Sequence, residues 1–246
     1  MLFRSPAQPV AGSAGEAAGP VGGLGQGKGS FQNQPVTQKV DVTDAMMLDA
    51  DRSDDWILHG RTYDNQRFTP FTQIHAGNVR QLRPTAIIQT GITKTFQMTA
   101  IEVDGVLYLE TADNQIQAYD ALTGKQLWSY IPTLGYSNLC CGQIARGVAV
   151  AYGKVFAAQL DGHVVALDAR TGKLIWKTEH ANALPQPSFF YSFTVAPIVL
   201  NGLVLVGNAG AEWPTRGFLE ALDANTGKLV WRFHTTAAPD QPGGDT

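Results

Sequence analysis

Three times along the chain, a short run of alternating apolar residues leads into a turn and then into a second run that ends in tryptophan. The copies read AYDALTGKQLW ending at Trp128, ALDARTGKLIW ending at Trp176, and ALDANTGKLVW ending at Trp231. Alternation predicts strands, because successive side chains of a strand point to opposite faces. The copies recur at intervals of roughly 50 residues, a period that indicates a repeat architecture.

The turn inside each copy has the composition of a hairpin. The sequence Asp-Ala-x-Thr-Gly stands at 120–124, 168–172 and 223–227. An aspartate at this place can accept a hydrogen bond from the backbone two residues on, and the glycine supplies the positive φ that closes the turn. We therefore predict three antiparallel hairpins, each with its tryptophan on one face of the closing strand.

A second strand–turn–strand pattern precedes each hairpin, at 103–113, 152–162 and 201–210. Each repeat thus offers about four short strands, the makeup of one propeller blade. We predict an all-β fold of the β-propeller type, in which the repeated tryptophan fills the space between successive blades. A plain β-sandwich with recurring hairpin turns is the alternative, and three near-identical copies favour the propeller. The repeats are expected at about 85–135, 144–190 and 191–236.

The segment before the repeats has a different composition. Residues 1–40 are rich in Gly, Ala, Pro and Gln and are expected to form a flexible, disordered leader before a propeller at 41–246. A short helix is expected at 41–53, with Thr43 as its N-cap. Residues 56–60 resemble a short strand. Residues 75–82 would form one or two helical turns.

Length and composition narrow the class of protein. The chain has 246 residues, a net charge of −3 and 44% hydrophobic residues, which is typical of a globular protein and excludes a nucleic-acid-binding or wholly disordered chain. No apolar run approaches the ~20 residues of a membrane span, and the start lacks the apolar core of a secretory signal. Three blades cannot close a ring and leave open sheet edges. We therefore expect the chain to be the amino-terminal part of a longer protein.

The two cysteines are adjacent, at Cys140 and Cys141. Neighbouring Cα atoms lie ~3.8 Å apart, below the ~4.4–6.8 Å usual for a disulfide. A bond between them would close a small ring and would imply an oxidising compartment and a local function. Two reduced, buried cysteines are an equally good interpretation of the spacing.

Two further side chains are candidates for ligand binding. Arg146 follows the cysteines, and an arginine after a turn can clamp a carboxylate, although a lone arginine is more often a solvated surface residue. The stretch 207–213 interrupts a strand with small residues, which let a flat ligand approach the backbone, and then presents Glu212. Glu212 could ligate a hard cation through oxygen. The alternative is a tight turn with an exposed glutamate. The five histidines show no metal-binding spacing.

In combination these features resemble a known family. The tryptophan repeat, the Cys pair followed by Arg146, the Gly-Ala-Glu ending at Glu212 and the opening DWILHGRTYDNQRFTPFTQI at 55–74 are similar to the quinoprotein alcohol dehydrogenases. These are the pyrroloquinoline-quinone (PQQ) enzymes of the methanol/ethanol dehydrogenase group. The resemblance covers roughly residues 41–246. It implies an eight-bladed propeller with PQQ near its axis, of which this chain holds about the first three to four blades.

The resemblance assigns roles to the candidate residues. By this resemblance, Cys140 and Cys141 correspond to the vicinal disulfide that covers one face of the quinone. Arg146 corresponds to the arginine that pairs with polar groups of PQQ. Thr194 matches a threonine that bonds a PQQ carboxylate. Gln97 stands where many members place a glutamate that contacts the cofactor, so the hydrogen bonding is kept and the charge is lost.

The loop in the third repeat supplies the remaining matches. Gly210 and Ala211 match backbone contacts to the cofactor, and Glu212 matches the carboxylate that ligates the catalytic cation. That cation is Ca²⁺ in most members and a lanthanide in some. Ala209 stands where some members have Ser or Gly, and is expected to make a packing contact only.

The activity implied is oxidation of a primary or secondary alcohol. Hydride passes to PQQ, which the cation polarises, while an aspartate removes the alcohol proton. That aspartate and the asparagine ligand of the cation belong to later repeats, so no catalytic base is expected in this chain. We expect no turnover from the chain alone, which dye reduction with ethanol, PQQ and calcium would test. The implied setting is the periplasm, with cytochrome c or a similar electron acceptor and without nucleic acid or a membrane span.

The repeat has two other interpretations. Non-catalytic propellers of this kind act as assembly scaffolds in the bacterial envelope, but a scaffold gives no reason for the Cys pair, Arg146 or Glu212. Membrane-bound sugar dehydrogenases of the same superfamily lack the adjacent Cys pair. The alcohol dehydrogenases therefore fit the sequence best.

Overall fold

The repeats form three sheets in the computed structural model, which describes residues 33–135, 139–178, 191–213 and 215–244. Each sheet has four antiparallel strands in sequence order. We call the sheets blade 1, blade 2 and blade 3. Their strands are β1 (Ile101–Val103), β2 (Val106–Glu110), β3 (Ile116–Asp120) and β4 (Gln126–Tyr130); β5 (Ala149–Ala151), β6 (Lys154–Ala158), β7 (Val164–Asp168) and β8 (Leu174–Lys177); and β9 (Ile198–Leu200), β10 (Leu203–Gly207), β11 (Phe218–Asp223) and β12 (Leu229–His234).

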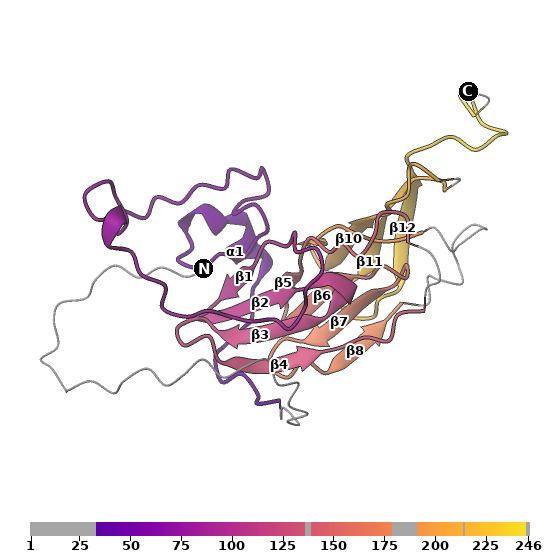
Figure 1. The fold of residues 1–246 in the computed structure, drawn as a ribbon. Coiled ribbons are helices and arrows are strands. Elements are labelled where there is room, and N and C mark those ends of the chain that lie inside the picture. Colours follow the sequence, from indigo (N-terminus) through magenta and orange to yellow (C-terminus); the bar gives the residue numbers. More distant parts are fainter. Residues whose placement is uncertain (1–32, 136–138, 179–190, 214, 245–246) are drawn as a thin grey trace, which may run out of the picture.

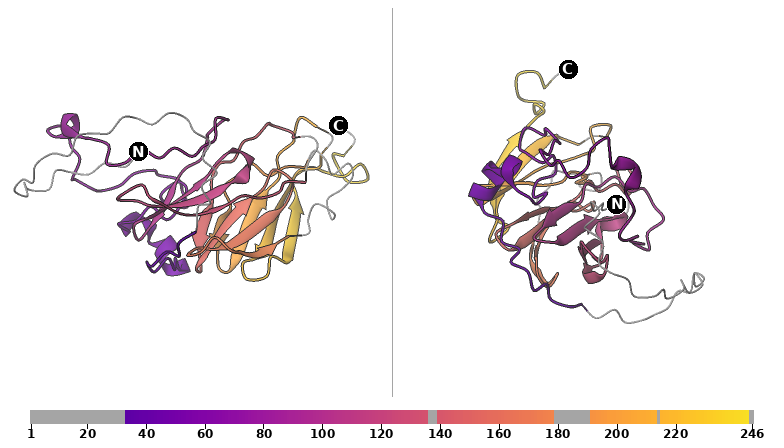
Figure 2. Two further views of the ribbon diagram at one scale, coloured as in Figure 1. Left: turned by 60° about the horizontal axis from the view of Figure 1, so that its bottom comes forward. Right: turned by 90° about the vertical axis from the view of Figure 1, so that its left-hand side faces the viewer.

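The blades are arranged as part of a propeller. Figure 1 shows them side by side in sequence order, and the turned views of Figure 2 show them fanning out from pink to yellow. The first strands of blades 2 and 3, β5 and β9, contact each other. This confirms the predicted all-β propeller fold, with one copy of the repeat in each blade.

The three predicted hairpins have the expected turn chemistry. In blade 2, Oδ1 of Asp168 accepts hydrogen bonds from the backbone amides of Arg170 at 3.1 Å and Thr171 at 2.8 Å. The Thr171 hydroxyl donates to the same oxygen at 2.7 Å. Gly172 follows with φ +68°, a conformation that glycine adopts without strain. Each turn therefore fixes the register that opposes the tryptophan to an alanine, Ala166 in blade 2.

The repeated tryptophan joins one blade to the next, as predicted. Trp128 is fully buried, and its Nε1 donates to the Ala169 carbonyl of blade 2 at 3.0 Å. Its ring lies against Gly172, where an added Cβ would fall 2.5 Å from a ring atom. Trp176 repeats the contact with blade 3, its Nε1 donating to the Ala224 carbonyl at 3.2 Å. Glycine in these turns therefore serves two purposes, a positive φ and room for the indole.

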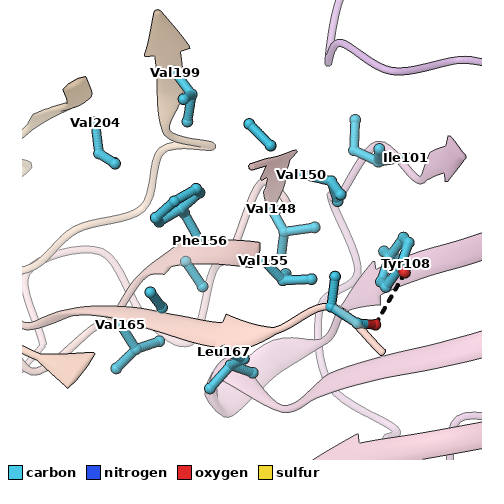
Figure 3. Close-up of a cluster of buried hydrophobic side chains, with 14 of the residues drawn as sticks. Ile101, Tyr108, Val148, Val150, Val155, Phe156, Val165, Leu167, Val199 and Val204 are labelled. Carbon is cyan, nitrogen blue, oxygen red and sulfur yellow. Dashed lines mark hydrogen bonds between the residues drawn. The ribbon is translucent and has the colours of Figure 1, made fainter. Parts of the chain in front are cut away.

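Buried hydrophobic side chains fill the space between the blades (Figure 3). Val150 on β5, Phe156 on β6 and Val199 on β9 belong to this core. The Tyr108 hydroxyl donates to the Ala169 carbonyl at 3.0 Å and so ties blade 1 to blade 2. Side chains of β2 pack into hydrophobic clusters on both faces of the strand, so β2 is buried along its whole length; β6 is buried except at Lys154.

The segment before the blades contains helical turns and irregular chain. Helix α1 (Asp44–Leu48) begins after Thr43, whose side chain accepts from the Met46 amide, which confirms the predicted N-cap. The 3₁₀ turns η1 (Ala50–Arg52) and η2 (Val79–Gln81) also lie in this segment, whereas η3 (Ala112–Asn114) lies between β2 and β3 of blade 1. The short helical stretch predicted at 75–82 is thus one 3₁₀ turn.

Two expectations for this segment require correction. Residues 56–60 form no strand; Trp56 makes a single bridge to Glu102 of β1, because the chain turns away after it. Of the expected leader, residues 1–32 lie outside the described part of the chain. Residues 33–40 are ordered against the blades: Val36 and Val40 are buried in the core, and the Val36 amide donates to the Arg170 carbonyl at 2.8 Å.

The strand order gives each blade two different ends. The turns between first and second strands and between third and fourth strands lie at one end, which we call the hairpin end. The loops between second and third strands lie at the opposite end, together with the links that lead to the next blade. We call this the link end.

Candidate functional site

The sequence candidates gather at the link end. Cys140, Cys141 and Arg146 belong to the link between β4 and β5, and Thr194 to the link between β8 and β9. Gly210, Ala211 and Glu212 form the loop between β10 and β11, and Gln97 lies on the chain that enters β1. Segments far apart in sequence thus meet at one end of the sheets.

The adjacent cysteines are joined by a disulfide, with their Cα atoms 3.8 Å apart. This decides between the two interpretations left open by the spacing. Both residues are half-buried. The Trp213 Nε1 donates to the Cys140 carbonyl at 3.2 Å. The disulfide therefore lies beside the loop that carries Glu212, the residue next to Trp213.

Arg146 is fixed by the link of the next blade. Its Nη1 donates to the Thr194 carbonyl at 2.9 Å and to the Thr194 hydroxyl at 2.6 Å. The Thr99 amide donates to the Arg146 carbonyl at 3.3 Å, which brings the chain around Gln97 to the same place. The Arg146 side chain is otherwise exposed, so its charge is available to a ligand.

The loop with Glu212 is tied to the Thr194 link. Ser192 and Ala209 form an antiparallel bridge, and the Ala209 amide donates to the Ser192 carbonyl at 2.8 Å. Gly210 is buried with φ +112°, and the Thr215 hydroxyl donates to its carbonyl at 2.6 Å. Ala211 and Glu212 are exposed beyond it. The chain thus bends at Gly210 as it leaves β10, and Glu212 follows in the exposed part of the loop.

Glu110, the last residue of β2, also lies at the link end, and the sequence analysis missed it. Its side chain is buried, and Oε1 accepts from Asn114 Nδ2 at 2.8 Å. Burial raises the pKa of Glu110 to about 8, opposed in part by hydrogen bonding from Asn114 and the Gly147 amide. Comparison of the repeats could have found it, because β6 and β10 end in Ala158 and Gly207.

The donor set fits a flat, anionic ligand that carries a cation. The guanidinium of Arg146, the amide of Gln97 and the hydroxyl of Thr194 are suited to carboxylates. The disulfide and the Trp213 ring supply apolar surface. Glu212 is an exposed oxygen ligand for a hard cation. Within the described ranges no group of three or more His, Cys, Asp or Glu side chains could hold a metal, so Glu212 would be one ligand among several.

Comparison with known proteins gives the class. Residues 56–246 match the family profile of the glucose/ethanol/alcohol dehydrogenase β-propeller domain, the PQQ domain. The chain belongs to this family of PQQ propellers. Among the described residues, no helix is long and apolar enough to cross a membrane.

Individual relatives carry names of the same kind. The chain is 44% identical over 184 residues to quinohemoprotein alcohol dehydrogenase ADH IIB of Pseudomonas putida, covering 74% of this chain and 26% of that protein. It is 41% identical to the dehydrogenase subunit of a quinone alcohol dehydrogenase of Gluconobacter oxydans, covering 76% and 25%. The chain thus spans about a quarter of the length of these relatives.

Solved structures agree with the fold. Quinohemoprotein alcohol dehydrogenase from Comamonas testosteroni superposes with a TM-score of 0.77 at 34% identity, covering 82% of this chain and 31% of that one. A europium-containing methanol dehydrogenase superposes with a TM-score of 0.72 at 31% identity, covering 80% and 34%.

Proposed function

We propose that this chain forms part of a quinoprotein alcohol dehydrogenase and holds one side of its PQQ site. The observation that carries the proposal is the contact between the disulfide link and the Glu212 loop, made by Trp213 Nε1 and the Cys140 carbonyl. The names of the relatives support an alcohol as substrate. When bound, PQQ would accept hydride from a primary or secondary alcohol, with a cation polarising its carbonyl.

The chain's own residues would bind and orient the cofactor. The Cys140–Cys141 disulfide would cover one face of the ring system. Arg146 would pair with its polar groups while keeping its bond to Thr194, whose hydroxyl would bind a carboxylate. Gln97 would add a neutral hydrogen bond. Their preformed arrangement would limit the ordering needed on binding.

The loop of blade 3 would complete this side of the site. Gly210 and Ala211 would contact the cofactor through their backbone, which the absence of a large side chain allows. Glu212 would ligate the cation, either Ca²⁺ or a lanthanide. The europium-containing methanol dehydrogenase among the structural neighbours supports a lanthanide as an alternative to calcium.

The acceptor and the location follow from the same proposal. A relative from Thauera butanivorans is named 1-butanol dehydrogenase (cytochrome c), which supports cytochrome c or a similar protein as electron acceptor. A disulfide between neighbours suits an oxidising compartment, and we propose the periplasm. A non-catalytic envelope scaffold, the competing proposal, accounts for the blades and leaves the disulfide, Arg146 and Glu212 without a purpose.

Cofactor binding tests the proposal. PQQ titrated into the chain with Ca²⁺ should quench tryptophan fluorescence, because Trp213 borders the site. Arg146→Ala should weaken binding by about tenfold or more, through loss of a charged hydrogen-bonding partner. Arg80→Ala, at an exposed arginine of η2, is the matched control and should bind as the parent does. Equal binding by parent and Arg146→Ala, or none by either, would contradict the assignment.

The cation is tested at Glu212. Glu212→Gln keeps the shape of the side chain and removes the negative charge, so the Ca²⁺ or La³⁺ concentration that supports PQQ binding should rise by about tenfold. Asp240→Asn removes the charge of another exposed carboxylate and should leave the cation titration unchanged. A Glu212→Gln protein with the parent's cation dependence would show that this carboxylate is no ligand.

A further inference from the structure

Glu110 is a buried acid at a strand position where the other two blades have small residues. It ends β2, and the same position in blades 2 and 3 is Ala158 and Gly207. Burying a carboxyl group costs free energy unless its surroundings compensate for it. Because two of the three blades fold with a small residue here, the acid is not required for building a blade. The contacts of Glu110 indicate its role instead.

The contacts of Glu110 join blade 1 to blade 2. Its Oε1 accepts from Asn114 Nδ2 at 2.8 Å. The Asn114 amide in turn accepts from the Leu160 backbone at 2.8 Å and donates to the Ala158 carbonyl at 3.4 Å. Among the described residues, Oε2 has no hydrogen-bond partner of ordinary geometry. One polar chain thus runs from the end of β2 to the end of β6.

The other neighbour of Glu110 is the segment that carries Arg146. The backbone amide of Gly147 lies close enough to the Glu110 carboxyl group to lower its pKa by hydrogen bonding. Gly147 has φ +118°, and an added Cβ would lie 2.8 Å from the Thr99 carbonyl oxygen, so this segment is held closely from both sides. The Thr99 amide donates to the Arg146 carbonyl at 3.3 Å. Glu110 therefore lies behind the backbone from which the Arg146 side chain projects.

We propose that Glu110 is a positioning residue for the cofactor site: it fixes the Arg146–Gly147 segment to the junction of blades 1 and 2 and so directs the Arg146 guanidinium toward Thr194 and a bound anion. The identity of that anion as PQQ rests on the proposed function.

The neutral acid suits this place better than the carboxylate. An ionised Glu110 would place a buried negative charge beside the Asn114 side chain and the Gly147 amide, and the free-energy cost of that burial would weaken the packing that holds the Arg146–Gly147 segment. The neutral acid avoids this cost. Charged and titratable groups in the loops and links of this part of the chain include Lys94, Asp113, Arg146, Asp161 and His163. Of these, Lys94 and Asp113 pair with each other at 2.6 Å, and Asp161 lies 3.1 Å from His163.

The experiment compares Glu110→Gln, Glu110→Ala and Glu102→Gln, each measured below and above the pKa of Glu110. Glu102 is a matched control, because it lies in the same blade, burial raises its pKa, and it accepts from the Gly105 amide at 2.7 Å at the hairpin end. The first readout is the PQQ dissociation constant with Ca²⁺, from tryptophan fluorescence. The second is hydrogen exchange at the amides of Thr99 and Gly147.

Each variant has a distinct expected result. Below the pKa, Glu110→Ala should weaken PQQ binding by about tenfold and speed exchange at both amides, since the segment loses its support. Glu110→Gln mimics the neutral acid and should bind like the parent. Above the pKa the parent should lose affinity and Glu110→Gln should not. Glu102→Gln should follow the parent throughout.

Opposite results would overturn the proposal. It fails if Glu110→Ala matches the parent in both readouts, or if parent and Glu110→Gln change together with pH. Should Glu110→Ala not fold, the pH comparison of parent with Glu110→Gln decides. Should the parent bind no PQQ, the proposed function fails, and amide exchange still decides whether Glu110 holds the Arg146–Gly147 segment.

Discussion

At the scale of single residues, burial rather than charge pairing sets the behaviour of Glu110. Desolvation disfavours the carboxylate, and the hydrogen bonding from Asn114 and Gly147 only partly offsets it, so the pKa rises from 4.5 to about 8. The folded protein then holds a proton that the unfolded chain releases. The stability that Glu110 contributes by holding this proton is complete below the pKa of the unfolded state, and it is lost as the pH rises toward the pKa of the folded state.

We expect this loss to be visible in the free energy of unfolding. Between about pH 4.5 and about pH 8 the parent should lose stability on the order of 4 kcal/mol relative to Glu110→Gln, which has no proton to release. Urea unfolding of both proteins at the two ends of this range measures the difference. Parallel curves for parent and variant would mean that Glu110 titrates normally in the folded protein.

At the scale of elements, the hairpin and its tryptophan form the unit from which the molecule is built. The aspartate fixes the turn, the turn fixes the register, and the register places the indole against the glycine of the following blade. Trp128 is 0% exposed in this arrangement, whereas Trp231 on β12 is 39% exposed. The same residue in the same repeat thus has two different environments.

This difference predicts unequal effects of substitution. Trp128→Ala should lower the free energy of unfolding by about 3–5 kcal/mol, because it opens a cavity between two blades and leaves the Ala169 carbonyl with one partner fewer. Trp231→Ala should cost about 1 kcal/mol or less. Denaturant unfolding of both variants measures this. Equal losses would contradict the assignment of the indole as the joint between blades.

These elements were predictable from sequence because their information is local. The turn, its aspartate and the following tryptophan lie within a few residues of one another, and so do Thr43 and the helix it caps. The missed features depend on distant chain. Trp56 forms a single bridge to Glu102 of β1, and Glu110 interacts with the Gly147 amide in the link to blade 2. The residues next to Trp56 and Glu110 in sequence carry no information about these distant partners.

At the scale of the whole molecule, the candidate site belongs to no single blade. The links into blades 2 and 3, the loop of blade 3 and the chain entering blade 1 each supply part of it. The motifs that resemble the family named most of these residues, yet only the fold shows that Thr99 connects the Gln97 chain to Arg146. A change in the packing of two blades would therefore alter the site without touching any of its side chains.

The contact between a turn glycine and the indole of the neighbouring blade has a fixed direction along the chain. Gly172 belongs to blade 2 but makes room for the Trp128 ring of blade 1. In the same way, Gly227 belongs to blade 3 and makes room for the Trp176 ring of blade 2. A bulkier residue at either turn would thus displace the tryptophan of the repeat that comes earlier in the chain. The structural effect of such a substitution, inherited or engineered, should therefore be sought in the blade that precedes the altered residue.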